Sequence, residues 1–139
     1  IGGLNVNMGT ANITEIEFVT TAFDKSDGGN IDVLVRFNEA VDVGGTPQVT
    51  ITNGNQGAGT GRGPHLASYL SGTGTNELTF RFTLGAANAA TNEDDVLVIG
   101  TNATGLNGGT IKDAGTSTVS TITNSSAIGT AAGSITVAA

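Results

Sequence analysis

Hydrophobic and polar residues alternate along much of this chain, which is the pattern of β-strands that bury one face. The clearest stretch, Ile31–Asn38, is followed by a turn at Gly44–Pro47 and by a second alternating run, Thr46–Thr52. A Gly/Pro turn between two such runs predicts an antiparallel pair of strands. The run Glu77–Leu84 alternates in the same way. Its apolar residues, predicted to face inward, are Leu78, Phe80, Phe82 and Leu84.

Shorter apolar segments extend this picture to an all-β domain. They predict further strands at Ile13–Ala22, Leu66–Leu70, Val96–Ile99, Thr118–Thr123 and Ser134–Val137. Turns are predicted at Asp24–Asn30 and Ser71–Asn76, a Gly-rich loop at Asn53–Pro64 and a single helical turn within Ala86–Asp95. Seven or so short strands with frequent turns are typical of a sandwich. The predicted core is Ile16, Phe18, Val33, Val35, Phe37, Val49, Ile51, Leu78, Phe80, Phe82, Leu97 and Ile99.

The pattern divides the chain into three parts. Residues 1–12 are predicted to form an extended N-terminal arm, residues 13–123 a β-sandwich, and residues 124–139 a C-terminal tail with a final strand. The strand-like segments Leu4–Met8 and Ser134–Val137 could add a strand to the exposed sheet edge of a neighbouring molecule. They could equally cover the edges of their own domain.

Composition and charge exclude several partners. The chain has 139 residues, enough for one domain with a core. Only 12% of residues are charged, against about 25% in ordinary domains. With a net charge of −7 and five Lys and Arg, we expect no nucleic-acid partner and no attraction to anionic membranes.

Two further features bear on redox chemistry and on the membrane. The chain has no Cys, so the fold must stand without disulfides or thiolate-bound metal. It shows no secretory signal and no apolar run long enough to span a bilayer, so no membrane insertion is expected. It begins at Ile1 without Met, which leaves open a lost start residue, a removed leader or an excised domain.

Polar residues that could carry chemistry are few. His65 is the single histidine, and a general base needs a nucleophile and an orienting carboxylate, which nothing near it in the sequence supplies. We therefore expect an exposed or rim histidine. Glu39 and other carboxylates could pair for glycoside hydrolysis. Sugar sites prefer exposed aromatic rings, however, and here most Phe residues and Tyr69 fall in strands.

Two acidic clusters offer oxygen atoms to calcium. They are Asp24, Asp27 and Asn30, and the run Asn92–Asp95. The first cluster lacks the spacing of an EF-hand, and the adjacent acids of the second would point to opposite sides of a strand, so we interpret both as solvated turns. The loop Gly57–Gly63 is followed by Pro64 and a β pattern instead of a helix, which argues against phosphate binding and favours a contact region. We accordingly predict no catalytic, cofactor-binding or metal-binding residue.

Three glycosylation sequons begin at Asn12, Asn102 and Asn124. Such matches are expected by chance in a chain so rich in Asn and Thr. No function is assigned to them.

Several motifs occur together in one order along the chain. They are Glu39-Ala40-Val41, Gly45-Thr46-Pro47-Gln48, Ser71-Gly72-Thr73-Gly74-Thr75 and Asn107-Gly108-Gly109-Thr110. Over Ile13–Ala114 the chain resembles the bacterial immunoglobulin-like repeats of large surface adhesins and of marine phage virion proteins. The resemblance implies an immunoglobulin-like antiparallel β-sandwich that serves adhesion or assembly.

The function expected from these observations is structural and non-enzymatic. The first hypothesis is a capsid-decorating protein on the surface of a phage virion, bound to the major capsid protein or to copies of itself as a homo-oligomer. The alternative is an extracellular or cell-surface module: a bacterial adhesin repeat, or a filament subunit joined by donor-strand exchange.

Overall fold

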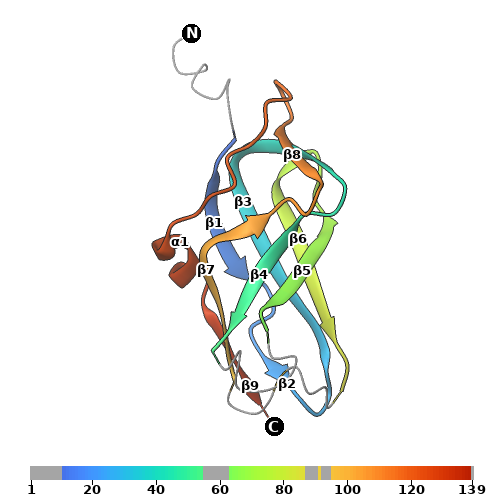
Figure 1. Ribbon diagram of the computed structural model, residues 1–139, viewed down its shortest axis with the longest axis vertical. Coiled ribbons are helices and arrows are strands. Elements are labelled where there is room, and N and C mark those ends of the chain that lie inside the picture. Colours follow the sequence, from blue (N-terminus) through green and yellow to red (C-terminus); the bar gives the residue numbers. More distant parts are fainter. Residues whose placement is uncertain (1–10, 55–62, 87–90, 92–94, 139) are drawn as a thin grey trace.

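The computed structural model describes residues 11–54, 63–86, 91 and 95–138 (Figure 1). These residues form an all-β domain with one short helix, which confirms the predicted fold class at that level. The elements are β1 (Ile13–Phe18), β2 (Phe23–Asp24), β3 (Gly29–Gly44), β4 (Gln48–Asn53), β5 (His65–Ser71), β6 (Thr75–Leu84), β7 (Val96–Gly105), β8 (Thr110–Asp113), α1 (Ser126–Ala131) and β9 (Ser134–Ala138).

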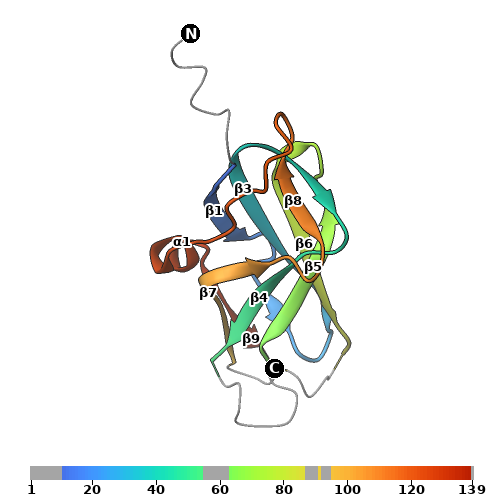
Figure 2. The same ribbon diagram turned by 45° about the horizontal axis from the view of Figure 1, so that its top comes forward.

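The strands form one hydrogen-bonded sheet in the order β1-β3-β6-β5-β4-β7-β9-β2, and β8 pairs with the far end of β3. Only β2 and β9 pair in parallel; the other strand pairs are antiparallel. The sheet curls, so that β4 and β7 lie in front of β1 and β3 (Figures 1 and 2). The two halves of the curled sheet enclose the hydrophobic core.

The core follows the alternation in the sequence. On the central pair, Val33 of β3 lies opposite Phe80 of β6, and Val35 lies opposite Leu78; all four are fully buried. Every residue of the predicted core is buried except Phe82, which is half-buried at the margin and packs against the core. Strand β3 is longer than predicted because it turns past Asn38 to pair with β8.

The C-terminal tail closes the open side of the sheet. Helix α1 contacts both β1 and β7, and the backbone N–H of Phe18 donates to the carbonyl of Ala132, just after the helix, at 3.1 Å. Strand β9 then pairs with β7 and places Ile135 and Val137 in the core. The predicted strand at Ser134–Val137 is confirmed, and it covers an edge of its own domain.

Helix α1 itself was not predicted. The sequence Ser126–Ala131 has no strong apolar periodicity. The helix is capped by the preceding residue, Ser125, whose hydroxyl accepts a hydrogen bond from the N–H of Ile128. That cap satisfies one of the free N–H groups of the first turn. Packing against β1 and β7 stabilises a helix that would be too short to persist alone.

The predicted closing strand Thr118–Thr123 is wrong. This segment makes two isolated bridges, between Val119 and Lys112 and between Thr121 and Asn12. Its backbone instead crosses the end of the domain, where the N–H of Thr121 donates to Ala11 at 2.8 Å. We call residues 114–121 the strap. The two apolar residues of the segment, Val119 and Ile122, are three positions apart and could not share one face of a strand, so the segment remains at the periphery.

The first strand is shorter than predicted and ends at Phe18. The N–H groups of Val19 and Thr20 both turn to the carbonyl of Asp32, which ends the regular ladder. The predicted arm segment Leu4–Met8 and most of Ala86–Asp95 lie outside the described residues.

Candidate functional site

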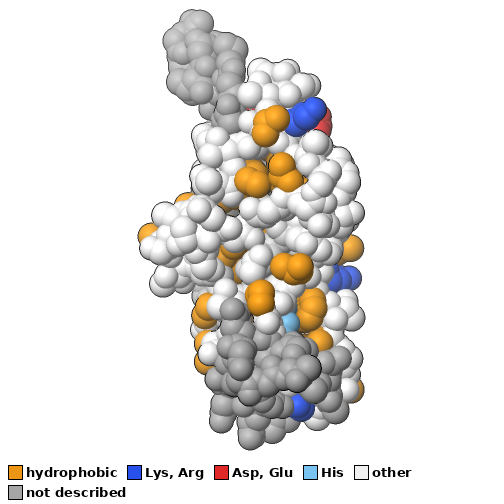
Figure 3. Space-filling model, viewed as in Figure 1, with side chains coloured by type: hydrophobic (Ala, Val, Ile, Leu, Met, Phe, Trp, Pro, Cys, Tyr) orange, Lys and Arg blue, Asp and Glu red, His pale blue; other side chains and the backbone are white. Residues whose placement is uncertain are grey.

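The surface of the domain divides into a charged half and a neutral half. Positions 48–54, 63–76, 96–111 and 114–139 contain no Asp, Glu, Lys or Arg. These positions include all of β4, β5, β7, α1 and β9. The strand order brings these elements together on one side of the molecule. In Figure 3 that side shows neutral polar and hydrophobic side chains, with Lys and Arg only at its margins.

We define the neutral face as the outward side chains of β4, β5 and β7. Cross-strand pairing places Thr50 beside Leu66 and Thr52 beside Val98, and Gln48 donates to the hydroxyl of Ser68. The members are Gln48, Thr50, Thr52, Leu66, Ser68, Leu70, Val96 and Val98.

Large apolar side chains are exposed on the neutral face, namely Val96 on β7 and, more strongly, two leucines on β5. Leu66 is 46% exposed and Leu70 is 47% exposed. Both belong to β5 and are exposed there, and Leu70 lies at the irregularity in the pairing of β5 with β6, between Tyr69 and Ser71. Thr50 lies opposite Leu66, and Gln48, Thr52 and Ser68 belong to the same face, so the face offers apolar contact together with hydrogen-bonding groups that carry no charge.

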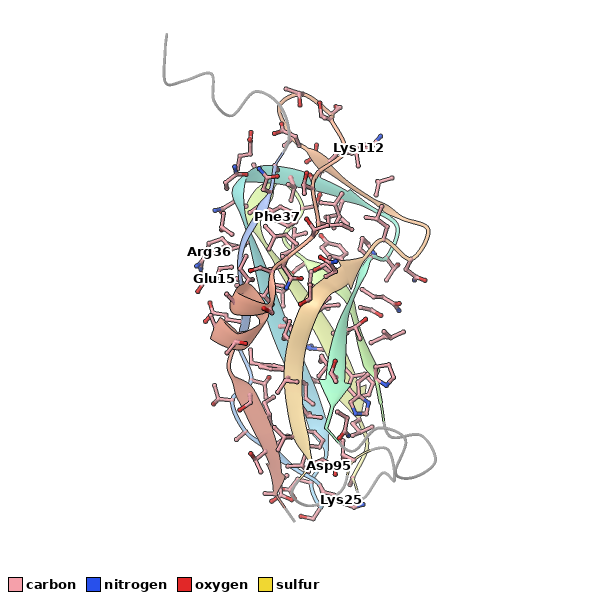
Figure 4. All side chains as sticks on the ribbon, turned by 60° about the vertical axis from the view of Figure 1, so that its left-hand side comes forward. Glu15, Lys25, Arg36, Phe37, Asp95 and Lys112 are labelled. Carbon is pink, nitrogen blue, oxygen red and sulfur yellow. The ribbon has the colours of Figure 1, made fainter. Side chains whose placement is uncertain are left out.

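The charged half lies on β1, β3 and β6. Arg81 of β6 makes a bidentate ion pair with Asp32 of β3, in which Nε and Nη2 donate to the two carboxylate oxygens at 2.8 and 2.9 Å. Arg36 of β3 lies between Glu15 and Glu77, its Nη2 2.6 Å from Glu77 (Figure 4). The hydrogen bond from Arg36 to Glu77 raises the pKa of Arg36. These pairs join neighbouring strands across the sheet and partly neutralise the carboxylates there.

His65 is buried, so the prediction of an exposed or rim histidine is wrong. Strand β5 begins at His65, which faces inward opposite Ile51 and is 4% exposed. Its ring stacks on Phe82 with 4.9 Å between ring centroids. Burial lowers the pKa of His65, and the charge of Asp95 opposes that effect. The side chain therefore packs as an aromatic residue at the end of the core.

A buried polar group surrounds His65. The amide nitrogen of Asn53 lies 3.4 Å from His65 Nε2 and donates to the carboxylate of Asp95 at 3.0 Å. Asn53 and Asp95 are both fully buried. Of the acidic run Asn92–Asp95, only Asp95 belongs to the described residues, and it serves this inner network. Sequence reasoning missed the group because its members come from three different strands and loops.

The other acidic cluster lies in the turn between β2 and β3. Asp24, Asp27 and Asn30 line one open depression together with Thr136 and Ala138. Asp24 accepts hydrogen bonds from the N–H and the hydroxyl of Ser26, which lower its pKa. Asn30 accepts from Thr83. One carboxylate oxygen of Asp24 and the side-chain oxygen of Asn30 are thus already used in local hydrogen bonds.

Glu39 does not meet a second carboxylate across a sugar cleft, but it does meet Asp113. Pairing of β3 with β8 brings Asp113 to the same end of the core as Glu39, and a hydrogen bond between the two carboxyl groups raises the pKa of Glu39 and lowers the pKa of Asp113. Glu39 lies between two buried residues of β3, Phe37 and Val41, and its own Oε2 is buried. An inward carboxyl on a strand predicts a buried polar partner.

Two of the three sequon asparagines have structural roles. Asn124 is 4% exposed, and its side-chain oxygen accepts from the N–H of Ala103 at 2.9 Å while its side-chain nitrogen donates to Gly100. Asn102 accepts in turn from the N–H of Asn124. Tyr69, which was predicted to lie in a strand, is part of β5, and its ring contacts Phe80 edge-on. The loop segment 55–62 is outside the described residues.

Comparisons with protein-family models, with curated proteins and with solved structures find no match to this chain. Within the described residues, no three His, Cys, Asp or Glu side chains gather at a point that could hold a metal ion. None of the helices in the described part of the chain is long and apolar enough to cross a membrane.

Proposed function

We propose that this chain is a non-enzymatic structural protein that decorates the surface of a phage virion. The observation that carries the proposal is the neutral face on β4, β5 and β7. A charge-free face can be removed from water without the large cost of stripping ions of their hydration. Leu66 and Leu70 add exposed apolar area, and the cores of protein interfaces are likewise depleted of charged residues.

The proposed occupant of the neutral face is the protein shell of the virion, the major capsid protein. The net charge of −7 supports this orientation, because most of the described acids that are not buried lie, at least partly exposed, on β1, β3 and β6. An acidic half turned to solvent keeps neighbouring copies apart and the particle soluble. A neutral half turned to the shell buries the surface that water solvates least well.

The use of the tail favours docking by a surface over donation of a strand. Ile135 and Val137 fill the core of their own domain, so giving β9 to a neighbour would empty that site. The neighbour's core would gain the apolar contacts that the donor's core loses, so donation of β9 brings no net gain in stability unless the neighbour donates its own tail in exchange. We therefore rank the decoration protein above the filament subunit. An adhesin repeat that uses the same face remains the alternative.

The proposal extends to the finer fold. The motifs around Glu39 and Gly108 resemble immunoglobulin-like repeats, and a curled antiparallel sheet with a closed core fits such a sandwich. We propose that the domain belongs to that architecture, with α1 and β9 as additions that close its side.

Immunogold labelling tests the function. An antibody raised against the purified chain is applied to virus particles and to bacterial cells from the culture that carries the gene. Regular labelling of intact particles supports the decoration protein. Labelling confined to cell surfaces or to filaments contradicts it and favours the adhesin alternative.

A further inference from the structure

Glu39 and Asp113 bring two carboxyl groups together inside the domain, and the role of this pair does not depend on the proposed function. Glu39 comes from the middle of β3 and Asp113 is the last residue of β8. Pairing of β3 with β8 sets Val41 opposite Asp113, which brings the two side chains to one end of the core. Asp113 is 1% exposed.

Each carboxyl group has one buried oxygen atom that accepts no hydrogen bond from the described residues. Glu39 Oε2 and Asp113 Oδ2 are buried, and no described group donates to either of them. The other oxygen of Asp113 is held at 2.8 and 3.0 Å by the N–H groups of Gly115 and Thr116. Two carboxylates cannot bond to each other, because both only accept. One proton placed between them supplies the missing donor.

We propose that Glu39 and Asp113 share one proton, with protonated Glu39 donating to the Asp113 carboxylate, and that this shared proton fastens the strap to β3. Asp113 takes the negative charge because two backbone N–H groups already point at it. The proton stays on Glu39, which has no such support.

The ionisable groups around the pair leave the shared proton as its counter-charge. On β3 and β8 the nearest are Asp42 and Lys112, which lie opposite each other on the outward face (Figure 4 labels Lys112). On β1 and β6, Glu15 and Glu77 are engaged by Arg36. The strap, residues 114–121, and residues 1–10 contain no ionisable side chain. No cation from the described residues therefore faces the two carboxyl groups.

The pair lies where the strap begins. The N–H of Ala114 donates to Ala40 at 3.0 Å, and the N–H of Asp113 donates to Thr118 at 2.7 Å. The strap then continues to Thr121, which bonds Ala11 beside the N-terminal end of the described chain. A second negative charge at Glu39 would repel Asp113 at the root of this segment. Loss of the proton should accordingly loosen the strap first.

The direction of the pH effect follows from both groups. The hydrogen bond to Asp113, together with burial, raises the pKa of Glu39, so its contribution to stability is full in acid and is lost as the pH rises through that raised pKa. The hydrogen bond from Glu39 lowers the pKa of Asp113, so its contribution is lost as the pH falls through that lowered pKa. The pair stabilises most between these two values.

Carboxyl ¹³C NMR titration of the wild-type chain is the first test. We expect Glu39 to titrate above a glutamate in an unfolded peptide, and Asp113 to titrate below an unfolded aspartate. In Asp113→Asn the amide can donate to an ionised Glu39, so the Glu39 midpoint should fall. Ordinary midpoints for both residues in the wild type would overturn the proposal.

Unfolding of Glu39→Gln is the second test, because glutamine keeps a donor at every pH. The variant should match the wild type in mild acid and become progressively more stable than it as the pH rises. Hydrogen exchange of the strap amides, corrected for intrinsic rates, should accelerate with pH in the wild type alone. A wild type that gains stability from calcium at the higher pH, while Glu39→Gln does not, would show a cation site and overturn the shared proton.

Discussion

Gly129 of α1 packs directly against the backbone carbonyl of Ile99 in β7. A Cβ atom at Gly129 would lie 2.5 Å from that oxygen and 2.8 Å from the carbonyl of Gly100. Both are backbone atoms that cannot move aside as a side chain can. The absence of a side chain at position 129 is therefore what allows the helix to approach the sheet and close its open side.

Gly129→Ala should destabilise the domain. Forcing one methyl group into such a contact costs about 1–3 kcal/mol, partly offset by the better helix propensity of alanine. The measurement is the free energy of unfolding in denaturant. Gly105→Ala is the control, because a Cβ at Gly105 meets no atom within 4 Å. Equal stabilities of the two variants would contradict the close packing of α1.

Ile135→Ala tests whether the tail is part of the core. Ile135 is fully buried, and removing so large a buried side chain costs about 2–5 kcal/mol. Thr136→Ala, on the exposed side of the same strand, is the control and should change stability little. A cost for Ile135→Ala no larger than for the control would mean that β9 is not held in its own domain.

Asn124→Ala should leave two backbone groups without their hydrogen-bond partner. Asn124 accepts from the N–H of Ala103 and donates to the carbonyl of Gly100, so its truncation leaves both without their partner. The expected loss is about 1–3 kcal/mol for each group that stays dry. Thermal unfolding measures it, with exposed Ser126→Ala as the control. Occupancy of the Asn124 sequon by a glycan in the folded protein would contradict the buried position.

His65 should make the domain sensitive to acid. Burial lowers the pKa of His65 in the folded state, so its contribution to stability is full above the unfolded value near 6.5 and is lost as the pH falls below it. His65→Phe keeps an aromatic ring against Phe82 and cannot take up a proton. The stability of the wild type relative to this variant should fall between about pH 7 and about pH 5. A constant difference would show that the pKa of His65 is the same in the folded and the unfolded state.

Alternation in the sequence predicted the strands well where one face of the strand is core. Val33, Val35, Leu78 and Phe80 are examples, since each lies opposite another core residue on the central strand pair. Thr118–Thr123 lacks this alternation, because its two apolar residues, Val119 and Ile122, are three positions apart and would fall on opposite faces of a strand. Ile122 packs against the core, whereas Val119 is exposed.

The polar clusters could not be predicted from the sequence, because they depend on contacts between residues that are far apart in the chain. His65, Asn53 and Asp95 come together because the end of β4, the start of β5 and the start of β7 lie side by side. Glu39 could have been noticed by its inward position between Phe37 and Val41, but its partner lies more than seventy positions away in the chain. The neutral face likewise becomes visible only once strand order places β4, β5 and β7 side by side.

The most direct test of the central claim is binding of the labelled chain to phage particles from the same culture, measured by co-sedimentation. The control pair Val19→Asp/Val119→Asp also replaces two exposed apolar residues, but away from the neutral face. We expect the wild type and this control to sediment with the particles, and Leu66→Asp/Leu70→Asp to stay in solution. Failure of the wild type to bind, or equal binding by both double variants, would contradict docking through the neutral face.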